Sequence, residues 1–184
     1  MIRFLDFTLA LMGLMLFWPV FALLYLLGLY DTGSPLFFQV RVGRHQQPFT
    51  LVKFRTMKIN TASVASHLAS SDSITRFGGF LRKTKLDELP QLWNVLKGEM
   101  SLVGPRPNLF NQRKLISNRE ELLVYSVRPG ITGLAQLNGI DMSTPELLAQ
   151  TDAQMIKEMS VLNYFKFIFQ TVIGKGSRDG VKGN

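Results

Sequence analysis

The chain has 184 residues, of which 46% are hydrophobic and 18% are charged. This composition excludes a disordered or fibrous protein and predicts one packed domain. The 21 Lys and Arg exceed the 13 Asp and Glu, and Cys is absent. A disulfide scaffold, a thiol nucleophile and a Cys-ligated metal are therefore excluded, and His45 and His67 alone cannot build a multi-His centre.

The segment from Phe7 to Tyr30 carries no charge. As a straight helix it would extend about 36 Å, which exceeds the ~30 Å hydrocarbon core of a bilayer. A secretory signal is the alternative, but the apolar stretch is too long and no cleavage site of small residues precedes Asp31. Residues 1–30 are therefore predicted to be a retained membrane helix.

Pro19 lies in the middle of this helix, where its missing N–H predicts a kink or a break. The residue by itself is compatible with a kinked spanning helix and with a re-entrant hairpin. We expect the re-entrant form, because a break at Pro19 leaves two arms of about a dozen residues, each too short to cross. The basic body then favours the cytoplasmic side of the membrane.

Residues 31–174 form the predicted body, and residues 175–184 a flexible tail. Alternating apolar residues predict strands over 36–42 and 50–54, joined as a hairpin. The Ser- and Ala-rich stretch 60–73 is either a loop or a weak helix. Helical spacing resumes at Ile74.

A second helix is predicted to begin at Leu86 or Asp87, because Pro90 is tolerated only in a first turn. Its predicted apolar face carries Leu86, Leu89, Leu92, Trp93 and Leu96, and its predicted polar face carries Asp87, Gln91 and Asn94. Asp87 and Glu88 would then lie at the positive end of the helix dipole, a position that suits a carboxylate pair, a nearby phosphate and Mg²⁺. A plain acidic helix cap is the alternative reading of this pair.

Two turns rich in Pro and Gly follow, over 101–108 and 127–133, separated by a helix predicted over 109–124. Ser143 to Glu146 is typical of a helix start with a capping hydroxyl and Pro in the first turn. The last predicted helix runs from Val161 to Ile173 and is apolar over most of its circumference. It fits either a membrane interface or an ordinary core.

Basic residues surround the acidic pair, with 15 Lys and Arg against 6 Asp and Glu from Arg41 to Arg128. This surplus indicates a phosphate-bearing partner, and a solvated face or attraction to lipid headgroups is the alternative for any single Lys. Arg106 is harder to explain as a solvating charge, because prolines flank it. The sequence contains neither a phosphate loop nor the nucleophile elbow of a hydrolase.

Five motifs in order resemble those of the bacterial monotopic polyprenyl-phosphate phosphoglycosyl transferases. They are the run Gly33–Gly43, Lys53-Phe-Arg-Thr-Met57, Leu86-Asp-Glu-Leu-Pro-Gln-Leu-x-Asn-Val-Leu-Lys-Gly98, Met100-Ser-Leu-Val-Gly-Pro-Arg-Pro107 and Val127-Arg-Pro-Gly-Ile-Thr-Gly-x-Ala-Gln136. The match covers nearly the whole chain, at the length of a minimal catalytic unit.

The resemblance implies a mainly helical α+β fold with a re-entrant N-terminal helix, a small β-hairpin and interfacial amphipathic helices. It implies Mg²⁺-dependent transfer of a sugar-1-phosphate from a UDP-sugar to undecaprenyl phosphate, by a catalytic domain on the cytoplasmic face of the bacterial inner membrane. Asp87 would be the nucleophile, and Glu88 would help to hold the metal. The other site residues expected from the motifs and their charge are Lys53, Arg55, Arg82, Arg106, Arg128 and Gln136.

An N-acetylated amino sugar is the expected donor by analogy with other minimal members, and membrane lipids are expected partners. The sequence is compatible with a homodimer as well as a monomer. Two rival functions are an inert scaffold for polysaccharide export and a membrane-anchored nucleic-acid-binding protein. The second conflicts with the scarcity of aromatic residues among the basic ones, so no nucleic-acid partner is expected.

Overall fold

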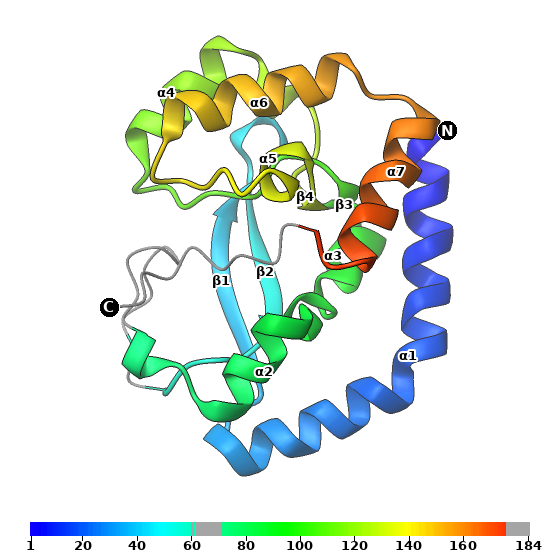
Figure 1. Cartoon of the computed structure of the whole chain (residues 1–184), viewed down its shortest axis with the longest axis vertical. Coiled ribbons are helices and arrows are strands. Elements are labelled where there is room, and N and C mark those ends of the chain that lie inside the picture. Colours follow the sequence, from blue (N-terminus) through cyan, green and yellow to red (C-terminus); the bar gives the residue numbers. More distant parts are fainter. Residues whose placement is uncertain (60, 62–70, 176–184) are drawn as a thin grey trace.

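The computed structural model describes residues 1–59, 61 and 71–175, and it has a mainly helical α+β architecture with two small sheets. A long bent helix, α1, runs along two sides of a body built from the remaining elements (Figure 1). Most of the segment 60–73, predicted as a loop or weak helix, lies outside the described residues. The same holds for the predicted tail 175–184, of which only Lys175 is described.

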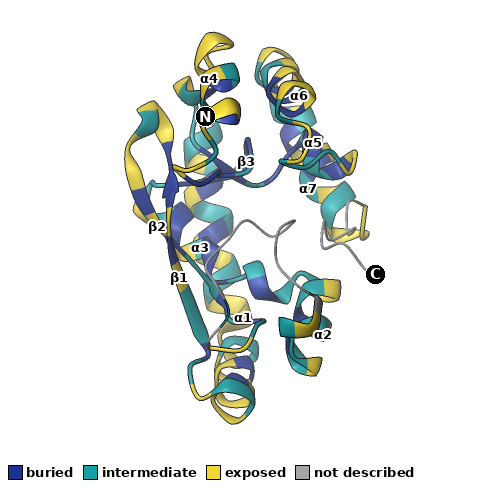
Figure 2. Cartoon of the chain, turned by 90° about the vertical axis from the view of Figure 1, so that its left-hand side faces the viewer, coloured by how far each residue is buried: buried dark blue, intermediate teal, exposed yellow. Residues whose placement is uncertain are grey.

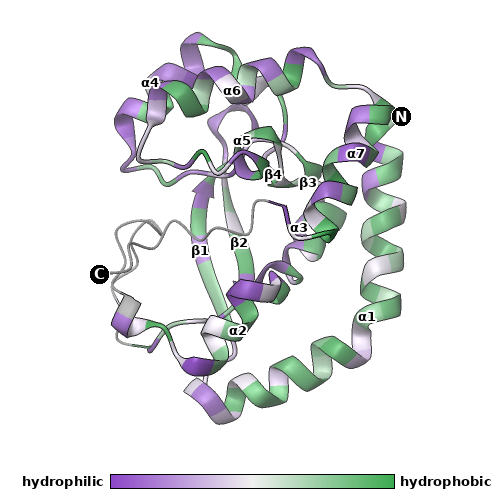
Figure 3. Ribbon diagram, viewed as in Figure 1, coloured by the Kyte–Doolittle hydropathy of each residue, from purple (hydrophilic) through white to green (hydrophobic). Residues whose placement is uncertain are grey.

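Helix α1 spans Ile2–Thr32 and is long and apolar enough to cross a membrane. It is green along most of its length in the hydropathy colouring of Figure 3. It continues through Pro19 and bends near its middle (Figure 1), as expected where a proline removes a backbone N–H. The predicted kink is confirmed. The predicted break at Pro19 is wrong, because α1 is helical on both sides of this residue.

The N-terminal half of α1 is fixed to the body by the buried carboxylate of Asp6. Its Oδ1 atom accepts hydrogen bonds from the Ser101 hydroxyl, the Leu102 N–H and the Tyr164 hydroxyl, each at 2.9 Å. Burial, followed by the nearby Asp6 charge, raises the pKa of Tyr164, so the phenol stays protonated and keeps donating. The Asp6 carboxylate thus holds the N-terminal half of α1 against β3 and α7.

The C-terminal end of α1 is held separately. The Thr75 hydroxyl donates to Asp31 Oδ2 at 2.7 Å and accepts from the Gly78 N–H, which makes Thr75 the N-cap of α2 as well. Helix α1 ends at Gly33, which adopts a left-handed conformation with φ 73°. Both ends of the apolar helix therefore hydrogen-bond to the same body.

The predicted hairpin is confirmed. Strand β1 (Leu36–Val42) pairs antiparallel with β2 (Pro48–Phe54), so that Leu36 lies opposite Phe54. A 3-10 turn over Arg44–Gln46 connects them. The second strand begins two residues earlier than expected because Pro48 pairs with Val42 at the hairpin end.

The acidic pair lies in a 3-10 turn over Leu86–Glu88, between α2 (Arg76–Thr84) and α3 (Gln91–Lys97). The prediction that both acids occupy the first turn of an α-helix is therefore wrong. Lys85 turns left-handed at φ 59° and ends α2, and α3 begins only after Pro90.

The expected faces of α3 also need correction. Asn94 is buried because its side chain bonds the edge of β2, accepting from the Val52 N–H and donating to the Thr50 carbonyl. Trp93, expected on the packed apolar face, is 55% exposed.

The second half of the chain begins with β3 (Ser101–Val103), which pairs in parallel with β4 (Gly130–Thr132). Gly104 and Gly130 let the two turns meet, since a Cβ on Gly130 would lie 2.0 Å from the Gly104 nitrogen. Figure 2 shows buried residues around β3 and exposed ones on the outer turns of the neighbouring helices.

The helices of this half are α4 (Arg113–Glu121), α5 (Leu134–Leu137), α6 (Pro145–Lys157) and α7 (Val161–Val172), with a 3-10 turn over Val124–Ser126. Helix α4 is shorter than the predicted 109–124. Helix α6 starts with Pro145 as expected, but the Thr144 side chain does not cap it.

Helix α7 has one buried side and one exposed apolar side. Tyr164 and Phe167 are buried in the core, against apolar residues at the start of α1. Leu162, Phe169 and Val172 are 80%, 65% and 78% exposed. One side of α7 is therefore core, and the other is available to a membrane interface.

A buried ion pair joins α4 to α6. Arg119 donates from Nε and Nη2 to Asp152 Oδ2, and both side chains are 1% exposed. The same two helices are also joined at the surface by Lys114 and Glu146, 2.8 Å apart, whose side chains are 69% and 68% exposed.

The buried and the exposed ion pair should contribute unequally to stability. Asp152→Ala leaves a buried guanidinium without its partner and should lower the free energy of unfolding by about 3–5 kcal/mol. Glu146→Ala removes a solvated partner from the same two helices and should leave stability unchanged. Denaturant unfolding of both variants checks this, and equal effects would contradict it.

Candidate functional site

Asp87 and Glu88 form the acidic centre of the candidate site. Asp87 is 6% exposed, whereas 21% of the Glu88 side chain is accessible. Because the acids precede α3 by a turn, its dipole does not act on them as directly as the sequence suggested. Positively charged side chains near Asp87 and Glu88 must therefore supply most of the positive potential at these two carboxylates.

Arg106 lies beside this pair, with Nη2 3.7 Å from Glu88 Oε1. Its backbone is held from two sides: Arg119 donates to the Arg106 carbonyl at 2.9 Å, and Arg41 donates to the Pro107 carbonyl at 3.1 Å. Flanking prolines and these two guanidiniums fix the segment, so the Arg106 side chain extends from a rigid support.

Lys53 and Arg41 add two further positive charges. Burial lowers the pKa of the Lys53 ammonium, an effect that Asp87 and Glu88 oppose and Arg106 and Arg41 reinforce. Burial, followed by the charge of Arg106, lowers the pKa of Arg41 to about 10. Three cations and two carboxylates therefore share one electrostatic environment, with a net positive charge that suits phosphate.

Arg82 lies on the last turn of α2, just before the acidic turn. Its Nε donates to the Thr56 hydroxyl at 3.0 Å, but its Nη1 is buried without a hydrogen-bond partner among the residues described. A buried guanidinium donor without an acceptor is unusual. A phosphate oxygen is one acceptor that would satisfy it.

The other three expected site residues donate hydrogen bonds to backbone carbonyls. Arg55 clamps the base of the hairpin, donating to the carbonyls of Ser34 and Leu36. Arg128 donates to the Gly98 carbonyl at the far end of α3. Gln136 donates to the Ile131 carbonyl, and its own Oε1 is buried without a partner in the described chain.

Arg41 is a site residue that the sequence-based reasoning did not select. It lies between Val40 and Val42 on β1, and a charged side chain flanked by valines in a strand is the signal that could have identified it. Arg119 was likewise missed, because nothing in its own helix indicates that it supports Arg106 13 residues away.

The acidic pair fits Mg²⁺ only with help from a substrate. Within residues 1–59, 61 and 71–175, no group of three or more His, Cys, Asp or Glu side chains could hold a metal. Mg²⁺ commonly takes one or two carboxylates and completes its shell with phosphate oxygens and water. Asp87 and Glu88 supply that donor set.

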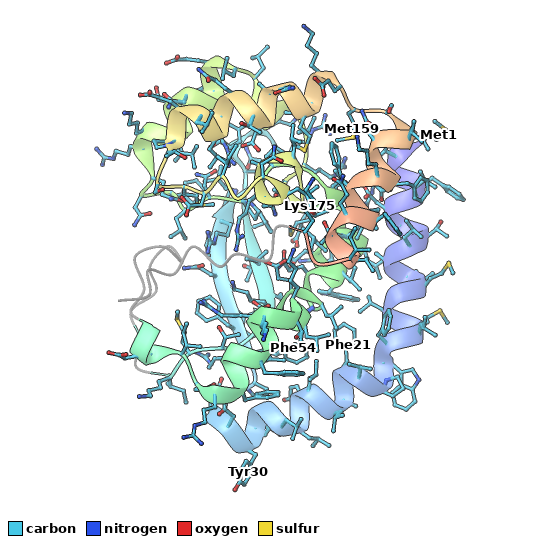
Figure 4. All side chains as sticks on the ribbon, viewed as in Figure 1. Met1, Phe21, Tyr30, Phe54, Met159 and Lys175 are labelled. Atoms are coloured by element: carbon cyan, nitrogen blue, oxygen red, sulfur yellow. The ribbon has the colours of Figure 1, made fainter. Side chains whose placement is uncertain are left out.

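An apolar cavity of about 530 Å³ adjoins the acidic turn. Its wall combines the bent part of α1, one face of the hairpin and residues that follow the acids. It includes Phe21, Tyr25, Phe38, Phe54, Pro90 and Trp93. Phe21 and Phe54 are labelled in Figure 4, and their rings lie 6.0 Å apart. Pro90 places one end of the cavity two residues from Glu88.

Comparison with known proteins identifies the same family that the sequence motifs resemble, over nearly the whole chain. Residues 1–176 match the family model described as "Bacterial sugar transferase". The chain is 36% identical over 97% of its length to an uncharacterized sugar transferase of Haemophilus influenzae. It is 39% identical over 91% to the UDP-glucose:undecaprenyl-phosphate glucose-1-phosphate transferase of Escherichia coli.

These two relatives are longer, and the chain spans 41% and 38% of their lengths. The uncharacterized sugar transferase EpsL of Bacillus subtilis is nearer in size: it is 43% identical over 76% of this chain, and the match covers 69% of EpsL. Since the family model matches almost the entire chain, the protein belongs to the bacterial sugar transferase family.

Proposed function

We propose that the protein transfers a sugar-1-phosphate from a UDP-sugar to undecaprenyl phosphate, releasing UMP, as the first membrane step of bacterial glycan assembly. The observation that carries the proposal is the carboxylate pair Asp87 and Glu88, held among Lys53, Arg41 and Arg106. The names of the Escherichia coli and Salmonella typhimurium relatives give the same reaction class.

Transfer proceeds in two steps. An Asp87 carboxylate oxygen attacks the phosphorus that bears the sugar, the bond to the bridging oxygen breaks, and UMP leaves with that oxygen. A phosphate oxygen of the lipid then attacks the same phosphorus, forms the lipid diphosphate sugar and restores the Asp87 carboxylate. Each step forms one P–O bond and breaks one.

Cations make this attack feasible, because a diphosphate repels an anionic nucleophile. Arg106 approaches from its rigid segment, and Lys53 and Arg41 raise the positive potential around the acids. Asp87 and Glu88 would hold Mg²⁺ together with the diphosphate, and the metal supplies further charge neutralisation when bound.

The lipid acceptor would use the apolar cavity beside the acids. Its prenyl chain is apolar and its phosphate must reach Asp87, and the cavity lies between the membrane helix and Pro90. The donor sugar is a separate question. An N-acetylated amino sugar is our prediction, and a panel of UDP-sugars that also includes UDP-glucose and UDP-galactose tests it through UMP release.

Helix α1 is proposed to be re-entrant, with the body on the cytoplasmic face. Asp6 and Arg3 at one end, and Asp31 at the other, bond to the same body. A spanning helix would have to break one of these sets of contacts, because its ends would lie on opposite sides of the membrane.

Asp87→Asn should abolish UMP release, by on the order of 10⁴-fold or more, because the amide is a poor nucleophile. UMP formed from the UDP-sugar panel with undecaprenyl phosphate and Mg²⁺ is the measurement. Glu120→Gln, which neutralises an exposed carboxylate on α4, is the matched control. Substantial activity in Asp87→Asn, with deamidation excluded by mass, would rule out the covalent role; no UMP release by the unmodified protein would favour the inert scaffold.

Arg106→Lys keeps the charge but loses the planar fork that binds two phosphate oxygens. We expect kcat/KM to fall roughly 10- to 100-fold, the equivalent of a charge-assisted hydrogen bond. Arg113→Lys on the exposed side of α4 should have no effect. Near-normal kinetics in Arg106→Lys would reduce this residue to a generic positive charge.

Topology is tested with single cysteines in this Cys-free chain. Ile2→Cys and the body control Asn111→Cys should both resist an impermeant thiol reagent in intact cells and react once the inner membrane is opened. A periplasmic cysteine protein verifies that the reagent works. Labelling of Ile2→Cys alone in intact cells would establish a spanning helix.

A further inference from the structure

A second hollow, of about 260 Å³, lies where the first turn of α1 meets the end of the hairpin. Its polar lining includes Arg3 from α1, Arg44 from the hairpin connection and Arg128 from the turn before β4. Met159, which also lines the hollow, is labelled near Met1 in Figure 4. Three guanidiniums from distant segments thus converge on one space.

Backbone contacts orient these arginines without neutralising them. Arg3 donates to the Leu96 carbonyl at 3.2 Å and weakly to that of Met100, Arg44 to the Ser126 carbonyl at 2.8 Å, and Arg128 to the Gly98 carbonyl at 2.7 Å. Each guanidinium carries five N–H donors, so these contacts leave others available. Among the described residues, none of the three arginines forms an ion pair.

Asp6 is the acidic residue in this lining, and it does not balance the three positive charges. Its Oδ1 already accepts three hydrogen bonds. Burial, followed by the charges of Arg3 and Arg44, lowers the pKa of Arg128, as expected for cations held close together. An alternative explanation is that these arginines only cap the C-terminal end of α3, because Arg3 and Arg128 bond to carbonyls there. Arg44 does not fit this explanation, because it bonds to the Ser126 carbonyl instead.

We propose that this hollow binds a phosphate group and that an anionic membrane lipid supplies it. The surroundings favour a lipid over free phosphate. Ile2, Ile156 and Met159 form an apolar wall beside the arginines, and the exposed apolar residues Phe4 and Leu162 lie at the adjoining helix starts. A lipid headgroup offers both the phosphate and the apolar portion that such a site accommodates.

None of the proposed catalytic-site residues Arg41, Lys53, Asp87, Glu88 and Arg106 lines the hollow, although Pro105, which does, directly precedes Arg106. Asp87 precedes α3, whereas Arg128 contacts Gly98 at its C-terminal end. Eleven residues of largely helical chain separate these points, on the order of 15 Å at 1.5 Å per residue. Arg128 is accordingly assigned to lipid anchoring rather than to the UDP-sugar, and the inference does not depend on turnover.

The test is lipid binding to the purified full chain by native mass spectrometry. Dissociation constants are measured for dioleoyl phosphatidylglycerol and dioleoyl phosphatidylcholine. The variant Arg3→Gln/Arg44→Gln is compared with Arg76→Gln/Arg113→Gln, which removes the same charge from exposed positions outside the hollow. Arg44→Gln alone, at an exposed residue, serves if loss of the Arg3 contacts impairs folding, as judged by thermal unfolding.

We expect phosphatidylglycerol binding to weaken at least tenfold in Arg3→Gln/Arg44→Gln, by about threefold or more in Arg44→Gln, and not at all in the control. Equal affinities in all variants, or equal binding of phosphatidylcholine, would overturn the site. Inorganic phosphate or UMP at about 10 mM should fail to displace the lipid; displacement would overturn the lipid as the source and assign the hollow to free phosphate.

Discussion

The arrangement of the molecule depends on the carboxylate of Asp6. A charged residue near the start of an apolar helix is expensive to bury unless donors surround it, and here Ser101, Leu102 and Tyr164 provide three. The same contacts place α1 against β3 and α7. Because β3 leads directly into the segment that carries Arg106, the membrane helix and the candidate site share one support.

The segment around Arg106 is held rigid by its own prolines and by hydrogen bonds from two other parts of the chain. Pro105 and Pro107 restrict the backbone on either side of Arg106, and Arg119 and Arg41 hold two of its carbonyls. The buried partner of Arg119 is Asp152, so α6 contributes to the site without touching it. Preorganisation of this kind lets a cation meet a phosphate with little further loss of side-chain entropy.

The basic surplus of the chain divides into separate groups in space. Arg106 and Lys53 interact with the acids, and Arg41 interacts with Arg106 and Lys53. Arg55 closes the hairpin base, and Arg128 bonds to the opposite end of α3. One positive region lies at the acids, where a soluble anion is proposed to bind, and the other lies at the start of α1, where a lipid phosphate is proposed to bind.

The sequence by itself determined the apolar helix, its bend at Pro19, the hairpin, the rigid prolines around Arg106 and the family, because each depends on local spacing or a short motif. It did not identify Arg41, which lies close enough to Arg106 to be affected by its charge although the two residues are 65 positions apart in the chain. The sequence also predicted the two acids in the first turn of an α-helix, whereas they lie in a 3-10 turn before it. It predicted Asn94 on a polar face of α3, whereas Asn94 is buried. Tertiary contacts decided those points: Lys85 takes a left-handed conformation that ends α2, and Asn94 finds its partners on the edge of β2.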